Sequence, residues 1–264
     1  MVKPWHLIVF LSIFLFVLLF IFLFPKTQTN PDLIGAPTIS PQGKVKYPQD
    51  YTFVLLGDSM TAALGNSVEL KADLIKDYPN KTFEFLNYGF GSTNILSVEK
   101  RLTENTTNGR VYRPILDIDF NVILIESFGH NPLSEFPLEE GLKKQNEALD
   151  KIVSLISQSN PKATILFVAT IAPNRRRYGE GQIDLSLEQR AKWADERTAY
   201  IKNHIKYAQD HNIPLINIYK DSLVDGDGNL EYIDSANFIH PSPNGIIFIS
   251  HEIADFIFKN KILK

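Results

Sequence analysis

Phe53-Val-Leu-Leu-Gly-Asp-Ser-Met-Thr-Ala-Ala-Leu-Gly65 is the stretch that decides the fold. Its first four residues are apolar without interruption, which is typical of a strand buried on both faces of a parallel sheet. Gly57 lets the backbone turn after this strand, and Asp58 and Ser59 suit the first turn of a helix. Parallel sheets place their chemistry at the carboxyl ends of the strands. We therefore expect Ser59 at that edge, either as a helix cap or as a nucleophile.

Composition limits what the rest of the chain can build around Ser59. The 264 residues are 44% hydrophobic and 22% charged, which predicts one α/β domain of about 200 residues. A net charge of −3 argues against a nucleic-acid partner, because such proteins carry a basic excess. The chain contains no cysteine, which excludes disulfides, thiolate nucleophiles and zinc ribbons.

Residues 7–24 are apolar except for Ser12. At 1.5 Å per residue a helix of this length covers about 27 Å, enough to span a bilayer. We expect a transmembrane signal anchor within residues 1–25 and not a cleaved signal peptide, because the apolar stretch is long and no small residues follow it. Lys3 before the span and Lys26 after it weakly favour a cytoplasmic N-terminus. The remaining chain is then expected to be extracytoplasmic on a single-pass protein of the cell membrane.

A linker and one folded domain are predicted after the anchor. Residues 26–50 are rich in Pro, Thr, Gln and Asn and show no helical or alternating pattern, so we expect a linker there. Residues 51–264 alternate between strand-like and helix-like segments. The expected strands are 53–56, 82–86, 121–125, 163–169 and 213–218, and the main helices are 68–77, 139–156, 187–208 and 241–258. This alternation is typical of a parallel sheet with helices on both faces.

Four polar or small residues fall where the predicted strands end. Ser59, Gly91 and Asn131 each follow a predicted strand, and His240 lies in the loop before the last helix. A serine becomes a good nucleophile when an imidazole accepts its proton, and hydrogen-bond donors stabilise the oxyanion that forms. The four residues therefore predict a nucleophile, two oxyanion donors and a base.

The motifs around these residues resemble a known family. Gly57-Asp-Ser-Met60, Asn87 with Gly91, Gly129-His-Asn131 and His240-Pro-Ser occur in this order. They resemble the four blocks of the SGNH, or GDSL, hydrolases, and the resemblance covers about residues 51–264. It implies a flavodoxin-like three-layer α/β fold with a five-stranded parallel sheet.

The resemblance also implies an activity and a role for each residue. The expected reaction is ester hydrolysis through an acyl-serine, with Ser59 as nucleophile and His240 as base. The N–H groups of Ser59 and Gly91 and the side-chain amide of Asn131 would form the oxyanion hole. Family members act on lipids, acetylated sugars, peptidoglycan and small esters, so we expect an ester-containing small molecule, lipid or acylated glycan as substrate.

One position departs from the family pattern. The family has Asp three residues before the histidine, where this chain has Asn237. An Asn carbonyl can orient an imidazole but supplies no charge to stabilise imidazolium. Asp234, six residues before His240, is the alternative partner, and we favour Asn237. The block around Asn131 also has Pro132 where the family has Asp.

Two other functions stay open from the sequence. The substitution at Asn237 leaves room for a degenerate SGNH domain that binds envelope glycan without turnover. An acyl-serine could also pass its acyl group to an alcohol, which would make the protein an O-acyltransferase. Arg175-Arg-Arg177, after the fourth strand, is either a solvated loop or a site for an anionic part of the substrate.

No metal or cofactor is expected. The histidines form no HExxH pair or other ligand spacing. Residues 225–229, Asp-Gly-Asp-Gly-Asn, have the alternating oxygens of a calcium loop. They are followed by Leu230 where the sharp-turn Gly belongs, and no closing Glu occurs. We therefore predict an ordinary turn there.

Overall fold

The computed structural model describes residues 37–264. The predicted membrane span at residues 7–24 and the first part of the predicted linker lie outside the described residues. Between residues 37 and 264, no helix combines the length and apolar character that crossing a bilayer requires.

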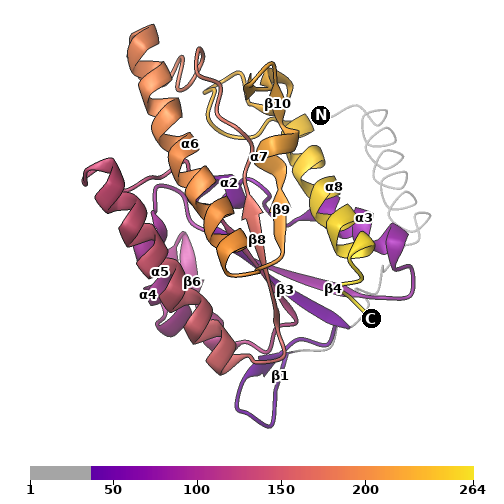
Figure 1. Ribbon diagram of the computed structural model, residues 1–264. Coiled ribbons are helices and arrows are strands. Elements are labelled where there is room, and N and C mark those ends of the chain that lie inside the picture. Colours follow the sequence, from indigo (N-terminus) through magenta and orange to yellow (C-terminus); the bar gives the residue numbers. More distant parts are fainter. Residues whose placement is uncertain (1–36) are drawn as a thin grey trace, which may run out of the picture. The chain divides into compact units, whose positions relative to one another are not determined.

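A five-stranded parallel sheet forms the centre of the domain (Figure 1), in the order β4-β3-β7-β8-β9. The first of these strands to be synthesised thus lies between the second and the third, which is the flavodoxin-like order. Leu55 of β3 is level with Asn87 of β4 on one side and Leu124 of β7 on the other. The predicted α/β fold with five parallel strands is confirmed. The strands are β3 (Tyr51–Gly57), β4 (Phe83–Gly89), β7 (Val122–Glu126), β8 (Thr164–Ala169) and β9 (Leu215–Asn217).

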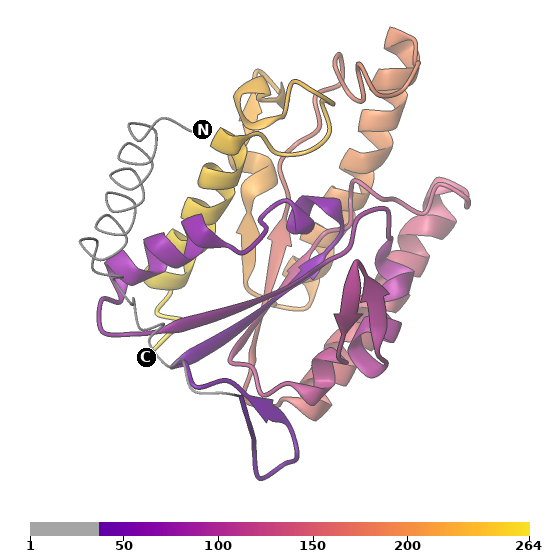
Figure 2. The same ribbon diagram turned by 180° about the vertical axis from the view of Figure 1, so that it is seen from behind.

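Helices cover both faces of this sheet (Figures 1 and 2). Phe53 and Leu55 of β3 pack in the cluster formed with α3 and α8, whereas Val54 and Leu56 pack in the cluster on the opposite face. Because β3 is buried on both sides, its sequence has no polar interruption. One face carries α3 (Val68–Asp77) and α8 (Pro243–Lys259), and the other carries α4 (Val98–Thr103), α5 (Leu138–Ser159) and α6 (Leu187–Asp210).

Local sequence signals fix where the long helices begin. Ser186 and Gln189 form a reciprocal capping box at the start of α6. Ser242 accepts a hydrogen bond from Gly245 N at the start of α8, and Pro243 occupies the first turn, where its missing donor costs nothing. The shorter elements are α2 (Ser59–Ala62), α7 (Ile218–Asp221), η1 (Ile95–Ser97), η2 (Ile115–Asp117) and η3 (Leu230–Tyr232).

Three two-stranded hairpins were not predicted, because strands of two or three residues are too short to show a period. They are β1 (Thr38–Ile39) with β2 (Val45–Lys46), β5 (Thr106–Asn108) with β6 (Arg110–Tyr112), and β10 (Leu223–Val224) with β11 (Asp227–Gly228). The first hairpin lies in the expected linker. Val45 is buried and its carbonyl accepts from Asp119 N at 2.8 Å, so this hairpin packs against the folded domain.

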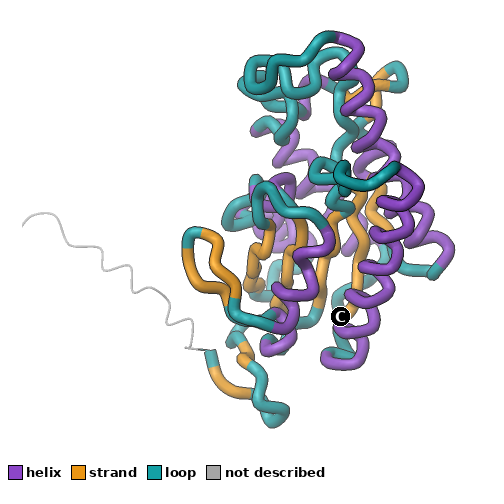
Figure 3. The backbone as a smooth tube through the Cα atoms, turned by 90° about the vertical axis from the view of Figure 1, so that its left-hand side faces the viewer, coloured by secondary structure: helices purple, strands orange, loops and turns teal. Residues whose placement is uncertain are grey.

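The loops that follow the carboxyl ends of the strands gather at one end of the domain, at the top in Figure 3. The loop after β3 carries Ser59, the loop after β4 carries Gly91, and the loop after β7 carries Asn131. His240 lies between η3 and α8. The topology therefore delivers the predicted site residues to one edge of the sheet.

Candidate active site

Ser59 is the first residue of α2 and its side chain is half-buried at the end of β3. The preceding Asp58 is fully buried and caps the turn, because its Oδ1 accepts from Met60 N at 2.8 Å. Gly57 is required at this turn, since a Cβ there would lie 1.9 Å from Thr61 Oγ1. The turn therefore fixes the backbone of Ser59 at the edge of the sheet.

Gly91 lies directly beside Ser59. A Cβ built on Gly91 would lie 3.9 Å from the Cβ of Ser59. Asn87, at the end of β4, links this strand to the segment after Ser59. Its Nδ2 donates to the carbonyls of Thr61 and Gly65 at 2.9 Å each. Asn87 thus acts on the backbone around the site.

Asn131 joins this pair from the third loop. Its Nδ2 donates to Asp58 Oδ2 at 2.9 Å, which orients the amide and leaves its second hydrogen available. Within residues 37–264, the backbone N–H groups of Ser59 and Gly91 donate no hydrogen bond. Asp58 therefore links the amide of Asn131 to the residue before Ser59, and the N–H groups of Ser59 and Gly91 and one hydrogen of that amide remain available as donors within the described residues.

A second buried carboxyl group, Glu126, supports the two loops from below. Its Oε1 accepts from Ser127 Oγ at 2.7 Å and from Phe128 N at 3.0 Å, and its Oε2 accepts from Asp58 N at 3.3 Å. Phe128 has a left-handed backbone, φ 55°, which a bulky residue adopts only when its surroundings hold it there. Glu126 therefore links the turn that carries Ser59 to the turn that leads to Asn131.

The two buried carboxyl groups compete for protons. Burial raises the pKa of Asp58, although its hydrogen bonds with Asn131 and Met60 oppose the rise. Burial raises the pKa of Glu126 well above its usual range, and the neighbouring charge of Asp58 adds to the effect. We therefore assign the proton to Glu126, which leaves Asp58 as the ionised acceptor for the amide of Asn131.

Arg101 of α4 is the buried cation of this region, with 1% of its surface exposed. Its Nη1 donates to the carbonyls of Gly57 at 2.7 Å and Tyr88 at 2.9 Å, and its Nη2 donates to Ser97 Oγ at 2.8 Å. Burial lowers the pKa of Arg101 to about 10, opposed by the charges of Asp58 and Glu126. Arg101 therefore joins the ends of β3 and β4 while it remains protonated at neutral pH.

Neither Glu126 nor Arg101 was singled out from the sequence. Glu126 follows four apolar strand residues, and this abrupt acidic end of a strand is a signal that could have found it. Arg101 lies in the charged run Glu99-Lys100-Arg101, which resembles a solvated helix face and gives no such signal.

His240 lies on a tightly bonded loop, residues 234–240. Asn237 Oδ1 accepts from the backbone N–H groups of Ile239 and His240, both at 2.9 Å, and Asp234 N donates to the carbonyl of His240 at 2.8 Å. Asp234 Oδ1 accepts from Ala236 N at 2.9 Å, and its Oδ2 accepts from Asn237 Nδ2 at 3.4 Å. Both predicted partners of the imidazole are thus bonded to backbone or to each other, and the roles of Asn237 and Asp234 in catalysis stay predictions.

A buried histidine connects the Asn131 loop with the loop after β8. His130 Nε2 lies 3.3 Å from the carbonyl of Ile171, and its Nδ1 lies 3.4 Å from the hydroxyl of Tyr178. The Tyr178 hydroxyl in turn accepts from Arg197 Nε at 3.1 Å. Burial lowers the pKa of His130 to about 3, and the positive charge of Arg197 contributes to the shift. His130 is therefore neutral near neutral pH and holds the Asn131 loop against the loop after β8.

The arginine-rich turn after β8 is largely neutralised. Arg175 forms a two-pronged ion pair with Asp195, with N···O distances of 2.7 and 2.8 Å, and Arg177 pairs with Glu180. These pairings disfavour a role for Arg175 or Arg177 as a cation reserved for substrate. Residues 225–226 form the turn of the β10–β11 hairpin, as predicted.

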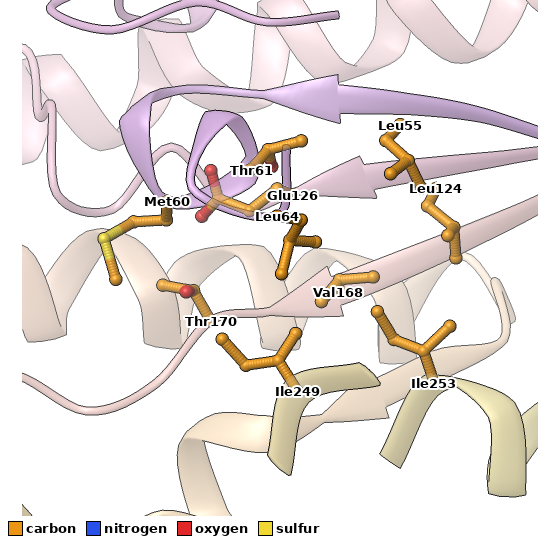
Figure 4. Close-up of a pocket in the computed structure, with 10 residues that line it drawn as sticks. All are labelled: Leu55, Met60, Thr61, Leu64, Leu124, Glu126, Val168, Thr170, Ile249 and Ile253. Atoms are coloured by element: carbon orange, nitrogen blue, oxygen red, sulfur yellow. The ribbon is translucent and has the colours of Figure 1, made fainter. Parts of the chain in front are cut away.

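A cavity of about 20 Å³ lies beneath the turn that carries Ser59 (Figure 4). Three of its lining side chains are polar, namely Thr61, Glu126 and Thr170, and the others are apolar. A space of this size holds about one water molecule. The cavity is therefore too small to receive an acyl chain.

Comparisons with known proteins agree with this geometry. The sequence profile of the GDSL-like Lipase/Acylhydrolase family matches residues 55–245. Among solved structures, the lipase/acylhydrolase from Enterococcus faecalis is 18% identical with a TM-score of 0.55, covering 80% of this chain and 96% of that chain. The acetylxylan esterase Axe2 from Geobacillus stearothermophilus is 14% identical with a TM-score of 0.51, covering 79% and 94%. A search of curated protein sequences finds no match.

Proposed function

The chain belongs to the GDSL-like lipase/acylhydrolase family, whose members are ester hydrolases, and we propose that it removes short acyl groups from an O-acylated substrate through an acyl-Ser59 intermediate. A cell-envelope glycan is the substrate class that we favour, with a lipid or small ester as the alternatives. The observation that carries the proposal is that Gly91 lies beside Ser59 while Asn131 is hydrogen-bonded to the adjacent Asp58, with an N–H donor left available on each of Ser59, Gly91 and Asn131.

The proposed chemistry follows from what each residue can do. His240 takes the proton of Ser59 as the hydroxyl attacks the ester carbonyl, and the N–H groups of Ser59 and Gly91 with the amide of Asn131 stabilise the oxyanion. His240 then protonates the leaving alkoxide, and water hydrolyses the acyl-serine by the same steps. Asn237 holds the backbone of His240, which is the way in which we propose that it orients the base.

The preference for a short acyl group rests on two of the structural neighbours. Gly91 is exposed beside Ser59, so the alcohol side of the ester has access from solvent. Two of the structural neighbours are acetylxylan esterases by title, which supports acetyl as the group to test first.

Labelling with a fluorophosphonate probe tests the nucleophile. We expect the full-length protein to be labelled and to hydrolyse short acyl esters, and Ser59→Ala to lose both properties while its thermal unfolding stays unchanged. Ser235→Ala, an exposed serine on the His240 loop, is the matched control and should behave as wild type. Labelling of Ser59→Ala at the wild-type level would overturn the assignment.

Substrate class and transfer are tested with the same preparation. Acetyl release is compared across acetylated glycans, lysophospholipids and short acyl esters, with and without added acceptor alcohols. Acylated acceptor in place of free acid would favour the O-acyltransferase, and labelling without turnover on any of these compounds would contradict the proposed hydrolysis.

We also propose that residues 7–24 anchor the protein in the cell membrane with its catalytic domain extracytoplasmic. Eighteen nearly unbroken apolar residues support this proposal. The protein should then stay with membranes during carbonate extraction. Recovery of a soluble form that begins after Phe24 would show cleavage instead.

A further inference from the structure

The loop that carries His240 is held from outside by the arginine-rich turn. Gly179 N donates to the carbonyl of Phe238 at 3.4 Å, and Gln182 Nε2 donates to the carbonyl of Ala236 at 3.2 Å. The guanidinium carbon of Arg177 lies 4.1 Å from the centre of the Phe238 ring, which is a cation–π distance. Residues 177–182 therefore contact the His240 loop at three points.

Phe238 is the residue of this loop that most needs support. Its φ is 50°, a left-handed conformation that a bulky side chain rarely adopts and that persists only where the surroundings impose it. The ring is 9% exposed and lies two residues before His240. A change in the position of this ring would therefore move the backbone that carries the imidazole.

Other residues of the turn hold Arg177 in the position from which it contacts Phe238. Asn174 Oδ1 accepts from Arg176 N at 3.2 Å and from Arg177 N at 3.1 Å, which holds the backbone of the turn. Glu180 pairs with the guanidinium of Arg177 and keeps its plane in place. The cation that lies on Phe238 thus comes from a rigid turn and not from a free surface side chain.

We propose that Arg177 is a positioning residue for His240, acting through the ring of Phe238. The inference rests on the proposed function, in which His240 is the base. Within residues 37–264 the imidazole of His240 makes no hydrogen bond to a carboxylate, so its placement depends on the backbone of residues 234–240. The arginine-rich turn therefore helps to fix the position of the His240 loop. In a site with a carboxylate bonded to the imidazole, that carboxylate would do part of this.

Steady-state kinetics of two matched variants test the proposal. Arg177→Met keeps the length of the side chain but removes its charge, and we expect kcat to fall at least tenfold while KM stays within twofold, because a small displacement of a catalytic group lowers the rate more than it lowers binding. Arg177→Lys keeps a cation over the ring and should recover kcat to within about threefold. Arg175→Met, from the same turn, is the control and should stay within twofold of wild type.

Two further measurements keep the test decisive. If Arg177→Met does not fold, Phe238→Leu removes the aromatic face instead and should lower kcat in the same way, and adding Arg177→Lys to it should cause no further loss. Hydrogen exchange of the peptide that covers residues 234–240 should be about tenfold faster in Arg177→Met than in Arg175→Met, because the Ile239 and His240 amides lose protection when the loop loosens.

Each result has a defined meaning. A wild-type kcat in Arg177→Met overturns the proposal, and so does a change confined to KM, which would make Arg177 a substrate contact. If wild-type protein shows no labelling and no turnover, the proposed function fails, and the exchange measurement alone decides whether Arg177 holds the loop. Equal exchange rates in Arg177→Met and Arg175→Met would overturn the proposal in that case.

Discussion

His204 should make the protein sensitive to mild acid. The side chain is fully buried in α6 and stacks on Phe167, with ring centres 4.3 Å apart and an interplanar angle of 13°. Neither ring nitrogen has a hydrogen-bond partner within the described residues. Burial lowers the pKa of His204 to about 3. The folded protein therefore holds this imidazole neutral at any pH near neutrality.

The size of the effect follows from the two pKa values. The unfolded chain takes up a proton at an ordinary histidine pKa of about 6.5, so stability is lost as the pH falls from there toward 3. At pH 5.0 the difference is about 1.5 pH units, which at about 1.36 kcal/mol per unit is about 2 kcal/mol of unfolding free energy. His204→Phe removes this term and keeps an aromatic ring against Phe167.

Urea unfolding, followed by tryptophan fluorescence at pH 7.5 and pH 5.0, measures the difference. Wild type should lose about 2 kcal/mol more than His204→Phe between the two conditions, while His251→Gln, an exposed histidine, should follow wild type. Other titrating groups cancel because both proteins share them. The same pH dependence in wild type and His204→Phe would refute the reasoning.

Three other outcomes are expected. Asn131→Ala should lower kcat about 10²- to 10³-fold with little change in KM, since this donor acts mainly in the transition state, and kinetics on a short acyl ester would contradict this by showing a pure KM effect. Asn237→Ala should lower kcat because the His240 amide loses its acceptor, whereas Asn237→Asp should retain or raise it. Asp234→Ala should stay within a few fold, and a collapse in that variant alone would overturn the role given to Asn237. Glu126→Gln should become more stable relative to wild type as the pH rises from 5 to 8 in urea unfolding. The reason is that the raised pKa of Glu126 keeps the folded carboxyl protonated while the unfolded one ionises above about 4.3.

The sheet could be predicted because a strand that is buried on both faces has an uninterrupted run of apolar residues. The uninterrupted run from Phe53 to Leu56 predicted a strand covered on both faces, and the clusters on either side of β3 confirm it. The last strand was predicted to reach Ile218 but ends at Asn217, because the side chain of Asn217 accepts from Lys220 N and starts α7. In the segments between strands, side chains such as that of Asn217 compete for backbone hydrogen bonds. The spacing of apolar residues does not reveal this competition.

The candidate site could be predicted only in part. The ends of strands can be read from the local sequence, whereas the pairing of side chains from different segments cannot. Ser59, Gly91 and Asn131 follow strands, so a parallel sheet had to bring them to one edge. The pairing of Asp58 with Glu126 arises because β3 and β7 are neighbours in the sheet, and the sequence does not state that order. The cation–π contact of Arg177 with Phe238 likewise joins two loops that meet only in the complete fold.

The residues of the candidate site are synthesised in a fixed order. Ser59, Gly91 and Asn131 leave the ribosome well before His240, which needs the whole sheet and the turn at residues 177–182 before it can be placed. Parallel strands pair across long separations, so this docking is among the slower events of folding. With the roles proposed above, a nascent chain would therefore have a nucleophile and its oxyanion donors before it has a base. The onset of esterase activity during synthesis or refolding would thus report the docking of residues 234–240, and not the formation of the sheet.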